Sequence, residues 1–509
     1  MSYSVDLANS FLTAFGKESG LLNVPYDILE RADGPYLVIY VVHPTERIFS
    51  ALQATYQHFP QGETFQNRAT IKRVKPIPGD RLVLPESRLL RSKLAESLTV
   101  DRYSFETSDF IDRYIRSVFG LEEQVTANGN HAIFGRRGSG KSSLLAYAMY
   151  QRSVEKRPYA WLAMQAYAGR NDLPVIADTL VEILRQLKLF DQSSVELSIL
   201  LERLEDLGNS KKISEHALDM LLPKIRRAIE PISNRYGSIT VFLDDLHVVH
   251  RSLQPLLLSK IYSVARGNRV YIKLSGIEQF THLWDTESRQ GLEPPHDIQV
   301  LRLDYNLTMP EKSLEHIQSI LDAYALYSAL PDISFLCGAG VLGRLVWVAA
   351  GVPRDALNLF SQAMTRATVK GQKKVSITSV NAAASEMAED KLRHLETDAS
   401  VDIVGIKTVL TKVRNFCVRE HRTNAFLVEI RNDNMEYLMI EKLVALRLLH
   451  VLHEGITPRE AGRRYKGLML DYGFYVGIRA AKSVELFKKI PEPLTAQELR
   501  GLPAFPLAS

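Results

Sequence analysis

Residues 131–149, HAIFGRRGSGKSSLLAYAM, contain Gly135, four intervening residues, and then Gly140-Lys141-Ser142. This spacing is the phosphate-loop (P-loop) pattern, in which backbone N–H groups surround a phosphate, the lysine binds the β and γ phosphates and the serine hydroxyl binds Mg²⁺. The pattern predicts a site for a nucleoside triphosphate and Mg²⁺. Its expected nucleotide contacts are the loop residues Gly135, Arg136, Arg137, Gly138, Ser139, Gly140, Lys141, Ser142 and Ser143.

The residues on either side of this loop fit such a site. Ala132, Ile133 and Phe134 form a short apolar run typical of a strand, and Leu144 and Leu145 begin the apolar face of a helix. A chance match in a glycine-rich turn is the alternative. The strand, loop and helix context favours the nucleotide site, because the helix N-terminus then directs its free N–H groups at the phosphate.

Two acidic residues, Asp244 and Asp245, directly follow the apolar run Ile239–Leu243. In parallel α/β sheets, ligands bind at the carboxyl ends of the strands. We therefore expect Asp244 to hold Mg²⁺ together with Ser142, and Asp245 to orient or polarise an attacking water. A pair of capping aspartates at a turn is the alternative interpretation.

Strand and helix patterns alternate from about residue 101 to residue 303, which predicts a parallel sheet covered on both faces and an α/β fold of the P-loop NTPase class. The expected strands are His131–Phe134, Tyr159–Met164, Ser238–Leu243, Arg269–Ser275 and Ile298–Leu303. The chain contains no Asn-Lys-any-Asp motif for guanine recognition, so ATP is the expected nucleotide.

Residues 309–395 carry four helical patterns, which we interpret as an all-helical lid on the core. The third pattern begins at the turn Gly351-Val352-Pro353-Arg354. With the P-loop and the acidic strand, this turn resembles the origin-recognition and initiator-like branch of AAA+ ATPases and the related STAND switch ATPases. The resemblance covers about residues 101–395 and implies an AAA+-like five-stranded parallel core, with Arg354 as a sensor of the γ phosphate. A solvent-exposed arginine near a helix start is the alternative.

The same resemblance implies two further site residues and one departure. Ser275 ends the strand beside the acidic one, where AAA+ ATPases carry a sensor of the γ phosphate or the attacking water. Arg289 is the only arginine in the loop before the fifth strand, where AAA+ members place an arginine that reaches a neighbouring subunit's nucleotide; an ordinary loop arginine is the alternative. Many members carry Asp-Glu where this chain has Asp244-Asp245. The shorter carboxylate predicts slow hydrolysis, because small positioning errors are costly.

Residues 401–509 hold 17 lysine and arginine residues against 12 acidic ones, which accounts for the whole formal net charge of +5. We predict a basic helix, a strand at Phe426–Ile430, a long apolar helix over 436–453, and a short capped helix from Thr457. That arrangement resembles a winged-helix domain, in which LMLDYGFYVGIRAAK supplies a third helix or a wing. Duplex DNA is the expected partner of Arg463, Arg464 and Lys466 on the short helix. A solvated face or a protein-docking face is the alternative.

Composition sets the remaining expectations. No apolar run approaches the roughly 20 residues of a membrane-spanning helix, and the first residues lack a signal peptide, so we expect a cytoplasmic protein with no membrane segment. Cys337 and Cys417 suggest buried thiols rather than a disulfide or zinc site. The expected domains are 1–95 (an α/β module of unknown role), 96–305 (the ATPase core), 306–397 (the lid) and 398–509 (the winged-helix-like domain).

Three functions fit these patterns. The first is a homo-oligomeric, Mg²⁺-dependent ATPase of the AAA+ type that acts as a nucleotide-dependent switch on DNA. The second is a STAND-type signalling or antiviral defence ATPase that oligomerises and docks a protein effector. The third is a nucleotide-stabilised scaffold without significant turnover.

Overall fold

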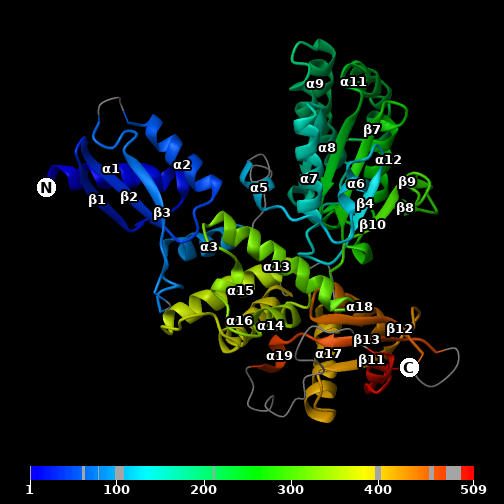
Figure 1. The fold of residues 1–509 in the computed structure, drawn as a ribbon. Helices are drawn as coiled ribbons and strands as arrows, with labels where there is room; N and C mark the ends of the chain where they lie inside the picture. The colour runs from blue at the N-terminus through cyan, green and yellow to red at the C-terminus, as the bar shows by residue number, and fades with distance from the viewer. Residues whose placement is uncertain are drawn as a thin grey trace.

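The computed structural model describes residues 2–59, 63–77, 79–97, 108–209, 213–305, 307–395, 403–457, 463–476 and 495–508. Figure 1 shows an N-terminal module, a sheet-containing core and a C-terminal domain arranged around a group of helices. Among the helices of these residues, none is long and apolar enough to cross a membrane.

The core is built on a five-stranded sheet in which every neighbouring pair of strands is parallel. Its order is β10-β4-β7-β6-β5, so the P-loop strand and the acidic strand flank β7. The strands are β4 (His131–Phe134), β5 (Tyr159–Ala163), β6 (Ile239–Asp244), β7 (Val270–Gly276) and β10 (Gln299–Arg302). The five predicted strands and the α/β P-loop NTPase fold class are confirmed.

Helices cover both faces of this sheet, as the apolar strands require. Ala132 and Phe134 of β4 pack toward one layer and Ile133 packs toward the other, since successive side chains of a strand alternate. The first layer contains α8 (Pro174–Lys188), α9 (Val195–Asn209), α11 (Leu222–Tyr236) and α12 (Gln254–Ala265). The second contains α6 (Leu121–Thr126) and α7 (Lys141–Val154).

The four predicted lid helices are present as α13 (Pro310–Tyr327), α14 (Val341–Val348), α15 (Pro353–Val369) and α16 (Ile377–Leu395). Their apolar faces share one continuous hydrophobic cluster with the C-terminal domain. Cys337 and Cys417 are buried free thiols within that cluster, as expected.

The N-terminal module is a three-stranded sheet with two helices packed against it. It consists of α1 (Ser2–Ser19), β1 (Tyr26–Arg31), β2 (Gly34–Val41), α2 (Glu46–Gln57) and β3 (Ala69–Arg73). A further helix, α3 (Pro85–Glu96), packs against α13 and α15. Glu86 of α3 accepts a hydrogen bond from the N–H of Val42, and Arg47 donates to the carbonyl of Tyr327. The module is therefore attached to the lid.

The C-terminal domain contains a four-stranded sheet of order β12-β13-β11-β14. Its elements are α17 (Ile403–Asn415), β11 (Ala425–Glu429), α18 (Met435–Ala445), β12 (Leu449–Ile456), β13 (Tyr465–Leu470), α19 (Gly473–Val476), α20 (Ala496–Arg500) and β14 (Ala504–Phe505). The hairpin strands β12 and β13 pair antiparallel, and β13 pairs antiparallel with β11.

One helix prediction in this domain was wrong, and a second was wrong in placing Lys466 on a helix. The apolar helix expected over 436–453 ends at Ala445, and β12 follows, because Leu449 and Val451 pair with Leu470 and Leu468 across the hairpin. The short helix expected from Thr457 was predicted to include Lys466, but residues 465–470 form the strand β13. Residues 458–462, where this helix would begin, lie outside the described ranges. One helix, α18, connects β11 to β12, so residues 425–456 contain no helix-turn-helix.

Candidate functional site

The P-loop lies between β4 and α7, and its glycines are sterically required. A Cβ atom added to Gly135 would lie 2.0 Å from the carbonyl oxygen of Leu303. Gly138 and Gly140 have φ values of +84° and +99°, a region that side chains disfavour. These three positions of the loop therefore require glycine. Without side chains there, the backbone can approach a phosphate closely.

Two polar groups in the loop suit a bound anion. Lys141 is 5% exposed, and its Nζ donates to the carbonyl oxygens of Gly135 and Arg136, each at 3.0 Å. Burial lowers the pKa of Lys141 to about 8. The Oγ atom of Ser139 is buried and has no hydrogen-bond partner among the described residues. A phosphate would supply both the negative charge and the acceptor that these groups lack.

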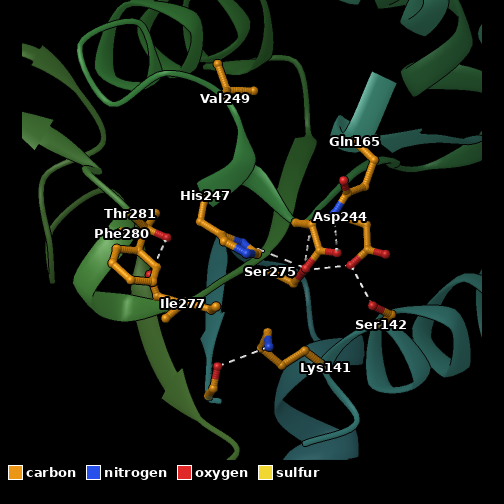
Figure 2. Close-up of polar contacts among 12 residues, drawn as sticks. Lys141, Ser142, Gln165, Asp244, His247, Val249, Ser275, Ile277, Phe280 and Thr281 are labelled. Atoms are coloured by element: carbon orange, nitrogen blue, oxygen red, sulfur yellow. Dashed lines mark hydrogen bonds and ion pairs between the residues drawn. The ribbon is translucent and has the colours of Figure 1, made fainter. Parts of the chain in front are cut away.

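Asp244 lies between the P-loop helix and β7 (Figure 2). Its Oδ1 atom accepts hydrogen bonds from Ser142 Oγ at 3.0 Å and from Ser275 Oγ at 2.6 Å. Burial, and then the neighbouring Asp245, raise the pKa of Asp244 to about 6. A hydroxyl and a carboxylate in contact are oxygen ligands of the kind that Mg²⁺ prefers, so Ser142 and Asp244 fit a magnesium site.

Asp245 lines the cavity beside the P-loop and has an unusual backbone conformation, with φ of +59°. Its N–H donates to Ser275 Oγ at 2.8 Å, and its Oδ2 accepts from Gln165 Nε2 at 3.4 Å. His247 Nδ1 lies 3.8 Å from Asp245 Oδ1. Gln165 and His247 were not identified from the sequence. The available signal for Gln165 was a polar residue just beyond the end of β5, which pairs with the acidic strand.

Ser275 and Arg289 occupy different surroundings. Ser275 is fully buried and bonds both aspartates, and it is not among the residues that line the cavity. In this structure it positions the acidic pair. Arg289 is exposed, in the turn between β8 (Trp284–Asp285) and β9 (Gln290–Gly291), and it does not line its own chain's cavity. Its role toward a neighbouring subunit stays a prediction.

Arg354 joins the lid to the P-loop. Its backbone N–H donates to the carbonyl oxygen of Gly138 at 3.2 Å, and its side chain lines the cavity. Burial, and then the nearby Arg447, lower the pKa of Arg354. The turn that the sequence marked as a sensor therefore brings a guanidinium to the phosphate loop.

Arg136 differs from the other P-loop side chains. It is 6% exposed and does not line the cavity. Its Nε donates to Asp304 Oδ1 at 2.8 Å, and its Nη2 donates to the carbonyl of Tyr305 and, at 3.4 Å, to that of Ala350. Its Nη1 lies 3.4 Å from Nδ1 of His450 in the C-terminal domain. The Arg136 side chain thus connects core, lid and C-terminal domain outside the cavity, and the contact of this loop residue with a nucleotide stays a prediction.

The cavity at this site has a volume of about 1750 Å³. The P-loop residues 137–143, the lid residues Arg354 and Leu357, and residues of α18 line it. Ligand pockets commonly measure about 300–1,000 Å³, so the space exceeds that of one nucleotide. The chain has a P-loop NTPase core with a large cavity beside its P-loop.

No protein-family model matches this sequence, and no curated protein matches it significantly. Similar solved structures include the Aeropyrum pernix ORC2 protein in its ADPNP–ADP complexes, with 13% identity over 75% of this chain and 96% of that one and a TM-score of 0.38. A Walker-type ATPase of Pyrococcus abyssi has 14% identity, coverage of 75% and 97%, and a TM-score of 0.41. The Aeropyrum pernix ORC1 protein in complex with DNA has 13% identity, coverage of 75% and 96%, and a TM-score of 0.40. The fold assignment itself rests on the strand order and P-loop of this chain.

Proposed function

We propose that this protein binds ATP with Mg²⁺, hydrolyses it slowly, and acts as a nucleotide-dependent switch. The observation that carries the proposal is the contact of Ser142 Oγ with Asp244 Oδ1 at 3.0 Å, next to the buried Lys141 of a sterically enforced P-loop. A motif lysine, a hydroxyl and a carboxylate then converge at the carboxyl ends of β4 and β6, the two strands that flank β7.

Each residue of the site has a defined task in hydrolysis. Lys141 and the loop N–H groups would bind the β and γ phosphates. Ser142 and Asp244 would hold Mg²⁺, which when bound supplies positive charge that offsets the charge on the transferred phosphoryl group. Asp245, which accepts a hydrogen bond from Gln165, would orient the attacking water and accept its proton.

The geometry at Asp245 supports a low rate. An aspartate carboxylate extends one methylene less than a glutamate, and a positioning error of about 1 Å can cost on the order of 100-fold. Its contact with Gln165 is long, at 3.4 Å. Slow turnover suits a switch, because the nucleotide state then persists.

Duplex DNA is the partner that we propose first. Arg463 and Arg464 are exposed directly before β13, at the loop end of the β12–β13 hairpin, where a wing would contact the phosphate backbone. Lys466 is not available for this contact: its side chain is 12% exposed, and its Nζ pairs with Glu441 at 2.8 Å and with Glu454 at 3.2 Å.

A STAND-type signalling or defence switch that docks a protein effector is the second candidate. Ion pairs within the C-terminal domain favour it, since they reduce the free positive charge that DNA would need. They include Lys412 with Glu436, Arg431 with Glu429, and Arg463 with Glu429. In either case we propose a homo-oligomer in which Arg289 reaches the neighbouring nucleotide.

The proposed ATP site can be tested by comparing the parent protein with Lys141→Ala by titration calorimetry with ATP and Mg²⁺. Loss of a charge-assisted contact to the phosphates should weaken binding by about 100-fold while the protein stays folded. Lys156→Ala changes an exposed lysine two residues beyond the end of α7; this variant is the matched control and should bind ATP like the parent. Equal ATP affinity in Lys141→Ala and the parent would overturn the assignment.

A further inference from the structure

Arg447 brings a positive charge from the C-terminal domain to the P-loop. It lies just after α18, and its Nη1 donates to Asp355 Oδ1 at the start of α15. A Cβ atom added to Gly138 would lie 3.3 Å from that Nη1 and 2.9 Å from the Cβ of Arg354. Arg447 and Arg354 both line the nucleotide cavity with Lys141.

The backbone at Arg447 is held in a costly conformation. Its φ is +63°, a left-handed value that glycine usually supplies after a helix end. A side chain persists in this conformation only when its surroundings fix it, and such positions concentrate at ligand sites. In this position the turn directs a guanidinium, 15% exposed, toward the P-loop.

One donor of this guanidinium lacks an acceptor in the part of the chain that the structure describes. The Nε atom of Arg447 is buried without a hydrogen-bond partner among the described residues. A buried donor without a partner is costly, and an anion would satisfy it. The Oγ atom of Ser139, in the adjacent loop, is also buried without a partner there.

The charges at this end of the cavity point to the same ligand class. Lys141, Arg137, Arg354 and Arg447 all line it. Arg447 and Arg137 both lower the pKa of Arg354, after burial, whereas Asp245 and Asp355 raise it. Positive charges held this close repel one another until a polyanion enters, and the phosphates of a nucleotide are such a group.

We infer that Arg447 is a phosphate ligand supplied by the C-terminal domain, so that a bound nucleoside di- or triphosphate holds this domain against the P-loop. The inference rests on the proposed ATP site. It assigns the C-terminal domain a direct share in nucleotide binding, in addition to any partner that its outer surface contacts.

The affinity test uses the full chain and compares ATP and ADP binding in the parent, Arg447→Ala, Arg447→Lys and Asp355→Asn by calorimetry. Arg447→Ala should weaken both nucleotides by about 10- to 100-fold, the range for a hydrogen bond to a charged group. Arg447→Lys should lose less. Asp355→Asn breaks the same ion pair but keeps the arginine, so it should bind within about threefold of the parent. Equal losses in Arg447→Ala and Asp355→Asn would show that Arg447 acts only through Asp355, and would overturn the inference.

The domain test measures hydrogen exchange of β12 and β13 with and without ATP. ATP should slow exchange there in the parent and in Asp355→Asn, but not in Arg447→Ala. If Arg447→Ala does not fold, the test uses the nucleotide affinity of Arg447→Lys and the effect of ATP on hydrogen exchange in the parent. A parent in which ATP does not slow exchange of β12 and β13 contradicts the inference. Failure of the parent itself to bind ATP would instead refute the proposed function, whereas a binding parent with an equally binding Arg447→Ala refutes only the role of Arg447.

Discussion

Arg136 of the P-loop and His450 of the C-terminal domain lie 314 positions apart in the chain, yet Nη1 of the arginine is 3.4 Å from Nδ1 of the histidine. The other ring nitrogen, Nε2, lies 3.0 Å from Asp471 Oδ2. Because a guanidinium can only donate, Nδ1 accepts and Nε2 carries the hydrogen that Asp471 accepts. A buried polar chain therefore runs from the phosphate loop into the C-terminal sheet.

We predict that Arg136→Ala destabilises the protein by about 2–3 kcal/mol, because it removes several buried hydrogen bonds and leaves His450 without its donor. Chemical denaturation measures the loss, and hydrogen exchange should show faster exchange in β12. Arg137→Ala is the control, since this neighbouring arginine is exposed, and it should change stability by less than about 0.5 kcal/mol. Equal stability of the two variants would show that the buried chain contributes nothing measurable.

Mg²⁺-dependent ATP affinity should be greatest between about pH 6 and pH 8. Asp244, with a pKa of about 6, is protonated below that range and loses its charge for Mg²⁺, whereas Lys141, with a pKa of about 8, is deprotonated above it. Calorimetry across pH 5–9 measures both limbs. The Asp244→Asn variant should keep the pH dependence that comes from protonation of ATP itself. It should lack the further decrease in affinity below about pH 6 that comes from Asp244. If the decrease at low pH is the same in this variant and the parent, it is caused by the ligand alone.

Asp244→Asn should also raise the stability of the ligand-free protein at pH 7. The folded state raises the pKa of this carboxyl, so it binds a proton more tightly than the unfolded chain and loses that advantage as the pH rises through about 6. Asparagine keeps an acceptor for Ser142 and Ser275 and removes the buried charge. A lower melting temperature than the parent at pH 7 would contradict this reasoning.

Asp245→Asn should leave ATP bound and reduce steady-state hydrolysis by about 100-fold or more, because the amide cannot accept the proton of the attacking water. Gln165→Ala should have a smaller effect, since it removes only the 3.4 Å contact that orients the carboxylate. Phosphate release measures both variants. If turnover in Asp245→Asn equals that of the parent, another residue activates the water.

The double variant Arg463→Ala with Arg464→Ala should weaken binding to any duplex DNA and flatten the slope of log affinity against log salt by roughly one to two. Lys466→Ala should instead lower the stability of the C-terminal domain, because it removes the ion pairs of Lys466 with Glu441 and Glu454. Fluorescence anisotropy and thermal melting separate the two effects. If the parent binds no DNA at low salt, the exposed face docks protein and the signalling function is preferred.

Hydrolysis per subunit should rise with protein concentration in the parent and stay flat in Arg289→Ala. Arg289 is exposed on the β8–β9 turn and lies outside its own chain's cavity, as a residue that serves a neighbour must. ATP binding should be unaffected by the substitution. A rate independent of concentration in the parent would remove this role.

The sequence indicated in advance which residues of the candidate site would lie together where the signal is local, and their roles stay predictions. Gly135, Lys141 and Ser142 stand at fixed spacing, and Asp244 follows an apolar run, so the meeting of Ser142 with Asp244 follows from parallel strands alone. The end of α18 was missed because twelve of the seventeen residues 436–452 are apolar, and neither glycine nor proline marks the stop. Arg447 takes the left-handed conformation in place of glycine there.

Contacts between distant segments had no local signal. Arg136 sits in a motif that predicts phosphate binding, and only the folded chain shows that His450 and Asp304 occupy its donors. Lys466 belongs to a basic run in the sequence, but strand pairing turns it toward Glu441. On a helix, Lys466 would lie on the same face as Arg463, three residues earlier. In the strand, its side chain instead points toward Glu441.

The hydrophobic cluster of the lid contains Val42 of the N-terminal module, Leu90 of α3, Leu345 of α14 and Leu443 of α18. The sheet of the core has separate clusters of its own. By packing, the lid and the C-terminal domain thus form one piece, to which the N-terminal module, with a cluster of its own, is tied by Val42 and by the hydrogen bond from Arg47 to Tyr327. A small rotation at Arg354 would swing the N-terminal module and the β12–β13 hairpin together, so two widely separated surfaces would report the same nucleotide.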